Sequence, residues 1–404
     1  EIIGEECREE AYACANELLE LAADYGFEGN LWHCFLSFCL ANHENAYSTS
    51  CEIIGPVGGS LSELARHDFA QVRELFSLDI ARLDETENGI WSEMKHYENA
   101  LENSKAFNHR IRDRIVELSV SLENAESDQE FQDIVTEFYK EFGVGKFGLN
   151  KAFHIIMDDE AKQVDIEPIT RVEHIELSDL VGYELQKAKL IENTEAFIEG
   201  RAANNCLLFG DSGTGKSTSI KAIVNQFYSQ GLRMIEIYKH QFKDLSTIIA
   251  QIKNRNYKFI IYMDDLSFEE FEIEYKFLKA VIEGGVETKP DNVLIYATSN
   301  RRHLIKETWK DREDMEHSED LHRSDTMEEK LSLVNRFGLS IFYAKPNKEG
   351  FNEMAVALAR RAGITPEVMS DEEICYEANR FEMRGGGLSG RTAQQFANYL
   401  LTIK

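Results

Sequence analysis

The stretch LLFGDSGTGKSTS, residues 207–219, decides how the rest of the chain is interpreted. It contains Gly210-x-x-x-x-Gly215-Lys216-Ser217, which is a complete Walker A pattern. An apolar strand-like run precedes the loop, and residues with helical spacing follow it. Glycines let backbone N–H groups turn inward without obstruction by a Cβ, so these donors and the helix N-terminus attract phosphate oxygens. The stretch therefore predicts a phosphate-binding loop between a strand and a helix.

Individual residues of this loop have expected roles. Lys216 should reach the β- and γ-phosphates of a bound nucleotide, and the Ser217 hydroxyl should be a ligand of Mg²⁺. The residues expected to form the phosphate cradle are Gly210, Asp211, Ser212, Gly213, Thr214, Gly215, Lys216, Ser217 and Thr218.

A second stretch, IIYMDD at 260–265, ends an apolar strand in two adjacent carboxylates. Two such ions lose hydration when a strand end is buried, so they need a compensating partner. Open α/β sheets place ligand-binding groups at the carboxyl ends of their strands. Asp264 is therefore expected to hold Mg²⁺, together with Ser217, as Walker B acids do.

Around these motifs, apolar segments alternate with helical stretches. The candidate strands are Cys206–Phe209, Leu232–Tyr238, Tyr257–Met263, Val293–Thr298 and Leu339–Tyr343. Near-continuous apolar strands that alternate with helices indicate a parallel sheet with both faces covered.

The flanking regions differ from this core. We expect an N-terminal helical domain over residues 1–150, a β-hairpin or linker over 151–169, an α/β core over 170–345 and a helical region over 346–404. The hairpin is predicted from two apolar runs on either side of the polar turn DDEAK.

Composition excludes some classes of protein. The formal net charge is −28, from 72 acidic and 44 basic residues, which argues against an electrostatic grip on nucleic acid. The seven cysteines include no C-x-x-C pair, so a reducing cytoplasm is expected rather than a disulfide framework. No apolar run approaches the ~18 residues of a membrane span, so a membrane partner is not expected.

With these residues identified, the chain resembles the AAA+ branch of P-loop ATPases from about residue 166 to 404. The resemblance uses several ordered motifs besides Walker A and Walker B. They are IELSDLVGYELQKAKLIENTEAF, VLIYATSN, EKLSLVNRFG and GGLSGRTAQQF. It implies an AAA+ core with a five-stranded parallel sheet, preceded by the helical domain and followed by a helical lid. It also implies that the bound nucleotide is ATP, with the DLVG segment and the following helix beside the adenine.

The resemblance also implies roles for three polar residues. Asn300 would be the sensor 1 residue, although it could also simply cap a following helix. Arg336 would be an arginine finger that acts on a neighbouring subunit, with Arg301 as its competitor, or it could only favour the end of its helix. Arg391 would be the sensor 2 residue of the lid, or an ordinary surface arginine.

Within AAA+, the sequence resembles one uncharacterised bacterial family, domain of unknown function 815. The stretches IEIYKHQ, IIYMDDLSFEEFEIEYK, IYATSNRRHLI and SGRTAQQF carry this similarity. The family implies ATP binding but supplies no client.

Position 265 departs from the AAA+ pattern, in which the Walker B aspartate is followed by glutamate. Asp265 is one methylene shorter, and a general base must come within ~2.6–3.2 Å of its proton, directly or through one water. Three interpretations follow. Asp265 could act as the base, Glu269 or Glu270 could replace it, or hydrolysis could be very slow.

The sequence as a whole predicts a cytoplasmic, Mg²⁺-dependent ATPase that forms a ring or filament of identical subunits and acts on an unknown protein client. The acidic segment 311–330 is a candidate contact with a neighbouring subunit. One alternative is a nucleotide-dependent switch or scaffold with little hydrolysis. Another is a nucleic-acid-remodelling ATPase such as a helicase loader, which the −28 charge disfavours.

Overall fold

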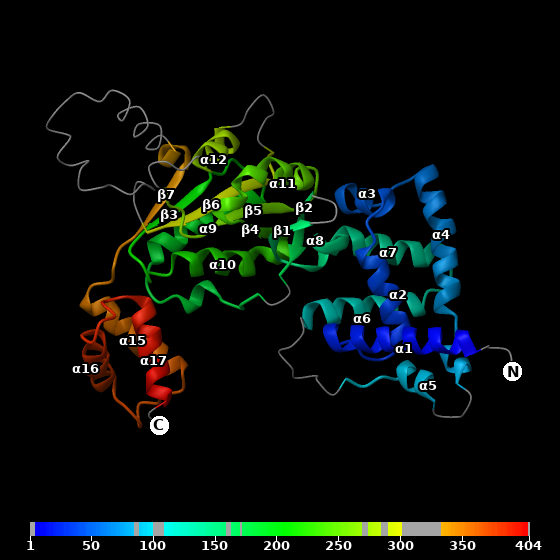
Figure 1. The fold of residues 1–404 in the computed structure, drawn as a ribbon, viewed down its shortest axis with the longest axis horizontal. Coiled ribbons are helices and arrows are strands. Elements are labelled where there is room, and N and C mark those ends of the chain that lie inside the picture. The colour runs from blue at the N-terminus through cyan, green and yellow to red at the C-terminus, as the bar shows by residue number, and fades with distance from the viewer. Residues whose placement is uncertain are drawn as a thin grey trace. The chain divides into compact units, whose positions relative to one another are not determined.

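Figure 1 shows the computed structural model of the 404-residue chain, which describes residues 5–84, 89–99, 109–158, 163–169, 172–268, 274–283, 290–300 and 333–402. Contacts divide the chain into two compact units. The first comprises Glu1–Asn150 with Pro168–Val172, and the second comprises Lys151–Glu167 with Glu173–Lys404. Separate clusters of buried apolar side chains lie in the two units.

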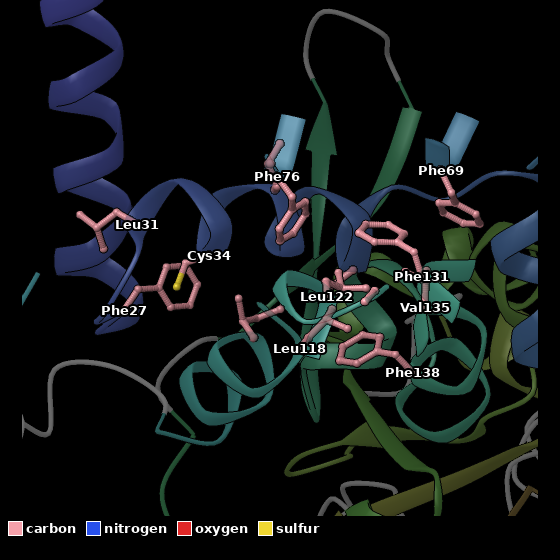
Figure 2. Packing of buried hydrophobic residues seen from close by; sticks show 14 of the residues in the cluster. Phe27, Leu31, Cys34, Phe69, Phe76, Leu118, Leu122, Phe131, Val135 and Phe138 are labelled. Carbon is pink, nitrogen blue, oxygen red and sulfur yellow. The ribbon is translucent and has the colours of Figure 1, made fainter. Parts of the chain in front are cut away.

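The first unit is helical, as its apolar spacing predicts. Its elements are α1 (Glu5–Tyr25), α2 (Leu31–Asn42), α3 (Ala46–Ile54), α4 (Ser60–Phe76), the 3₁₀ turn η1 (Ile80–Leu83), α5 (Ile90–Lys95), α6 (His109–Glu123), α7 (Asp128–Phe142) and α8 (Gly145–Leu149). Helix α7 buries Phe131, Val135 and Phe138 at helical spacing. Figure 2 shows these side chains beside Leu118 and Leu122 of α6. Burying one apolar face of each helix in this shared core stabilises the unit.

The second unit contains a sheet of seven strands within the described residues, in the order β2-β1-β4-β5-β6-β3-β7. The strands are β1 (Ala152–Asp158), β2 (Gln163–Pro168), β3 (Cys206–Gly210), β4 (Leu232–Glu236), β5 (Lys258–Met263), β6 (Val293–Ser299) and β7 (Leu339–Tyr343). The five predicted strands are present, and each pairing among them is parallel.

The sheet is larger than the five strands predicted, because the hairpin at 151–169 joins it. Strand β1 pairs in parallel with β4, with Ala152 opposite Met234 and Phe153 opposite Ile235. Without β1, strand β4 would be an edge with unpaired backbone N–H and C=O groups. The apolar Phe153 and Ile166 of the hairpin are fully buried. A local pattern predicts a hairpin but cannot show which sheet edge it covers.

Helices cover both faces of the sheet, with α10 along one face and α11 and α12 along the other (Figure 1). They are α9 (Glu184–Ile198), α10 (Lys216–Phe227), α11 (Leu245–Ile252) and α12 (Glu274–Glu283), with 3₁₀ turns η2 (Leu177–Asp179), η3 (Tyr228–Gln230) and η4 (Lys239–Asp244). Helix α10 buries Ile220, Ile223, Val224 and Phe227, a helical stripe against the sheet. This packing fixes the end of α10 that carries Lys216.

Three helices follow β7 and form a C-terminal helical region, which is called the lid below: α15 (Lys348–Arg361), α16 (Asp371–Glu382) and α17 (Gly390–Thr402). They share an apolar cluster that includes Phe351, Ile374 and Phe396, each at most 1% exposed. The lid and the sheet belong to the same contact unit. None of the described helices combines the length and apolar character needed to cross a membrane.

Candidate functional site

A cavity of about 810 Å³ lies at the carboxyl ends of β3, β5 and β6, and helices α15 and α17 of the lid contribute to its wall. Parallel sheets commonly bind ligands at this edge. The lining residues are Glu173, Ile175, Asp179, Leu180, Val181, Tyr183, Ser212–Thr218, Asp264, Asp265, Thr298, Asn300, Met354, Leu358, Gly390, Arg391, Gln394 and Gln395. The cavity thus brings together the glycine loop, both aspartates of β5, Asn300 and the lid arginine.

The glycine loop is built on backbone that few other residues adopt. Gly213 and Gly215 have φ values of +75° and +90°. A Cβ at position 213 would lie 3.1 Å from the Ser389 hydroxyl oxygen, and one at position 215 would lie 2.7 Å from Cδ2 of Leu180. Glycine at these positions therefore permits the left-handed backbone and the close approach of Ser389 and Leu180 to the loop.

Replacing Gly215 tests this space. We expect Gly215→Ala to lower the free energy of unfolding more than Gly231→Ala, which is a matched control. Both glycines have φ +90°, so both variants incur about 1–2 kcal/mol of left-handed strain, but position 231 has no neighbour within 4 Å. Urea unfolding of both variants measures the difference. Equal losses of unfolding free energy would mean that the Leu180 side chain moves aside at no cost.

Lys216 begins α10 and is almost completely buried, with 6% of its surface exposed. Its ammonium donates to the carbonyl oxygens of Gly210 (3.1 Å) and Asp211 (2.6 Å) and to Oδ1 of Asn300 (3.0 Å). Burial lowers the pKa of this ammonium, and the nearby carboxylates, first that of Asp265, only partly offset the effect. An anionic ligand in the loop would therefore stabilise the charged form of Lys216.

Asp264, at the tip of β5, accepts two hydroxyl hydrogen bonds at one oxygen. Ser217 donates at 2.7 Å and Thr298 at 2.6 Å, both to Oδ1 of Asp264. Desolvation would raise the pKa of Asp264, but hydrogen bonds to its carboxylate, first those from Thr298 and Ser217, together outweigh it and hold the pKa below its usual value. Asp264 is therefore a carboxylate at neutral pH, and its oxygen already lies beside the Ser217 hydroxyl.

These oxygens suit Mg²⁺, which prefers oxygen ligands and usually keeps several waters or substrate phosphate oxygens in its shell. Within the residues that the structure describes, no three His, Cys, Asp or Glu side chains gather as a metal cluster. A cation held only by Ser217 and Asp264 would need further oxygens from solvent or ligand. The donor set therefore fits Mg²⁺ bound together with phosphate.

Asp265 has an unusual backbone conformation, with φ +49°. Its amide donates to the Thr298 hydroxyl at 2.9 Å, and its Oδ1 accepts from Nδ2 of Asn300 at 2.7 Å. Asn300 thus links the Lys216 ammonium, which donates to its Oδ1, to the Asp265 carboxylate. The side chain of Asp265 is held in the cavity rather than turned away from it.

Tyr183 is a lining residue that the sequence did not single out. Among the described residues, Tyr183 (φ +62°) and Asp265 are the only non-glycine residues at positive φ, and both line this cavity. Such strain concentrates at functional sites. The Tyr183 hydroxyl donates to the carbonyl of Ala344 at 2.9 Å, and burial, followed by the charge of Asp211, raises the pKa of this hydroxyl to about 12.

The glycine loop also contacts the link between β7 and the lid. The Lys345 amide donates to Oδ2 of Asp211 at 3.1 Å, next to the Ala344 carbonyl that Tyr183 holds. Asp211 was predicted as part of the cradle, but sequence spacing gave no signal for this second contact. Thr298 was also missed, although its position two residues before Asn300 at the end of an apolar strand was a usable signal.

Of the two arginines with predicted roles, one lines the cavity and the other does not. Arg391, at the start of α17, lines the cavity, and its backbone amide donates to the carbonyl of Gly213 at 3.2 Å. Arg336 is exposed at the end of a helical turn and is not among the lining residues of the cavity. Arg301, Glu269, Glu270 and the segment 311–330 lie outside the described residues.

The parallel strand order, in which β6 lies between β5 and β3, and the glycine loop between β3 and α10 at the carboxyl edge of the sheet define an α/β core with the P-loop arrangement of strand, loop and helix, followed by a helical region. The chain belongs to the family described as "Protein of unknown function (DUF815)", whose model matches residues 150–403.

Among solved structures, the chain is similar to a mutant RuvB of Thermotoga maritima. The identity is 12% and the TM-score is 0.35, with 57% of this chain and 73% of that chain covered. A comparison with curated protein sequences gave no match.

Proposed function

We propose that this chain binds ATP with Mg²⁺ in the cavity between sheet and lid, and hydrolyses it. One observation carries the proposal: a single cavity contains the open glycine loop, the buried Lys216 ammonium and the paired oxygens of Ser217 and Asp264. These groups match a triphosphate with its cation in charge and in donor type. The lining also includes the apolar side chains of Ile175, Val181 and Met354, which would suit the base.

The proposed roles of the loop residues follow from their contacts. Lys216 would exchange its bonds to the loop carbonyls for bonds to the β- and γ-phosphates. Ser217 and Asp264 would hold Mg²⁺, which when bound neutralises charge on the phosphate oxygens. The backbone amides of Asp211–Thr218 would surround the phosphates, as in other glycine-rich loops that precede a helix.

Asp265 is the proposed general base. Asn300 donates to its Oδ1 and so fixes the direction of this oxygen. A water between this oxygen and the terminal phosphate would be oriented by both residues. Asn300 would therefore act as the sensor that joins the state of Lys216 to the position of the base.

The two arginines and a protein client complete the proposal. Arg391 would contact the phosphates from the lid, because it already lies against Gly213 of the loop. Arg336, which is exposed and outside the lining, would act on the nucleotide of a neighbouring subunit in a ring or filament. Changes in lid position would then transmit the nucleotide state to a protein client through the helical domain.

A second candidate, a nucleotide-dependent switch with little hydrolysis, is favoured by one observation. Asp265 is shorter than glutamate, and its Oδ1 is already engaged by the Asn300 amide. A base held in this way could be too remote from the attacking water.

Phosphate release from ATP by the wild-type protein, measured alongside its sedimentation mass, tests the proposal. We expect release above the spontaneous rate in the presence of Mg²⁺, its loss when EDTA removes the metal, and a larger mass when ATP is added. ATP binding without turnover would favour the switch. A protein that binds no adenine nucleotide would overturn both functions, and a strict monomer with ATP would remove Arg336 from the mechanism.

A further inference from the structure

Three consecutive carbonyl groups beside the cavity are held by cationic side chains from two different elements. Arg361, in the last turn of lid helix α15, donates through Nη2 to the carbonyl of Ser178 at 2.6 Å and through Nη1 to that of Asp179 at 2.7 Å. Lys187 of core helix α9 donates to the carbonyl of Leu180. Arg361 also lies 3.6 Å from the Asp179 carboxylate.

The residues held in this way form one wall of the cavity. Asp179 and Leu180 line it directly, next to Val181 and Tyr183. Leu180 also lies where a Cβ of Gly215 would be, so the same wall touches the phosphate loop. Lys187 is 7% exposed and would hold the wall to the core in any lid position, whereas Arg361 moves with the lid.

Helix α15 approaches the cavity at two points. Met354 and Leu358 contribute apolar surface to the lining, and Arg361, one turn further on, donates to the carbonyl of Asp179 in the cavity wall. A guanidinium that bridges two carbonyls and a carboxylate has its planar donors in fixed directions, which a single ammonium cannot reproduce. The contact therefore fixes the orientation of the lid helix relative to the wall, and not only its distance.

We propose that Arg361 is a positioning residue for nucleotide binding: through the carbonyls of Ser178 and Asp179 it holds the lid against one wall of the cavity. This inference rests on the proposed function. It assigns to the lid a second contact with the cavity, besides the contact of Arg391 with Gly213 of the loop. Nucleotide binding and the lid contact then stabilise each other, because both order the same wall.

Arg360 supplies a matched control on the same helix turn. Its guanidinium donates to the carbonyls of Ile364 and Met369 and to the Asp371 carboxylate, all within the lid. Arg360→Ala removes the same charge and a similar number of bonds without touching the wall. A general loss of lid stability should therefore appear in both variants, and a loss of wall position only in Arg361→Ala.

Calorimetric titration with ADP in Mg²⁺ is the first measurement. We expect Arg361→Ala to bind ADP roughly tenfold more weakly than the wild type, from the loss of charge-assisted hydrogen bonds. Arg361→Lys should recover part of the affinity, and Arg360→Ala should stay within about twofold of the wild type even if its melting temperature falls. Equal affinity losses in Arg361→Ala and Arg360→Ala would overturn the inference.

Hydrogen exchange of the unliganded protein is the second measurement, and it needs no nucleotide. Amides of the segment 175–183 should exchange faster in Arg361→Ala and at the wild-type rate in Arg360→Ala. Unchanged exchange in Arg361→Ala would show that the lid does not hold the wall. If the wild type binds no ADP while exchange responds as expected, the proposed function fails and the lid contact stands without a role in nucleotide binding.

Discussion

Lys216→Ala is expected to weaken ATP binding by roughly a hundredfold or more, because it removes charge-assisted hydrogen bonds of about 1.5–3 kcal/mol each to the phosphates. No other ammonium group lines the described part of the cavity. The amides of the loop and the N-terminus of α10 would remain, but they carry only partial charges. Calorimetric titration with ATP and Mg²⁺ measures the effect, and turnover should be lost with it.

The variant also removes a buried donor from the loop itself. The carbonyls of Gly210 and Asp211 and the amide oxygen of Asn300 would lose their partner, so some loss of stability is expected. Lys221→Ala, on the same helix but outside the lining of the cavity, controls for the loss of a lysine from α10. Near wild-type affinity in a folded Lys216→Ala protein would contradict the assignment of the cavity to a triphosphate.

Asp265→Asn is expected to lower steady-state ATP turnover by about 10²–10³-fold while ATP affinity changes little, because a general base contributes typically 10²–10⁴-fold to the rate. Asparagine has the same shape, tolerates the left-handed conformation at φ +49° and keeps an oxygen that can accept from Asn300. The change therefore isolates the basicity of the carboxylate from its structural contacts. Phosphate release and ATP affinity are measured on the same preparation.

Asp264→Asn is the companion variant for this experiment. Oδ1 of Asp264 accepts from Ser217 and Thr298, beside the proposed position of Mg²⁺. The variant is therefore expected to impair Mg²⁺-dependent ATP binding as well as turnover. The two neighbouring aspartates should thus separate into a metal-binding and a catalytic effect. Unchanged turnover in Asp265→Asn would remove Asp265 from the mechanism and direct attention to the acidic residues that follow it.

The local parts of the candidate site could be located from the sequence because their arrangement depends on short spacing. A strand, a glycine loop and a helix N-terminus lie within residues 206–227, so the path of the backbone there follows from local conformational preferences. The carboxyl ends of parallel strands meet at one sheet edge, which is why Asp264 and Asn300 could be expected near Lys216. Their roles in binding and catalysis remain predictions.

Other features became visible only from packing between distant segments. The hairpin strands join the edge of β4, Thr298 donates to Asp264, and Asp211 holds the amide of Lys345. Each of these contacts joins segments separated by tens of residues or more, and only that of Thr298 had a signal in the sequence, its place at the end of an apolar strand. Thr298 and Tyr183 are also common residue types, whose importance comes from their surroundings.

By itself, the sequence determined the α/β core, the position of the glycine loop and the residues at the strand ends, because periodic burial and glycine conformation act over a few neighbouring residues. Only the tertiary structure decided that Asn300 connects Lys216 to Asp265 and that Arg361 of the lid holds the wall of the cavity. Such contacts depend on strand order and on how the lid packs against the core. These are set by burial summed over the whole unit rather than by any local stretch.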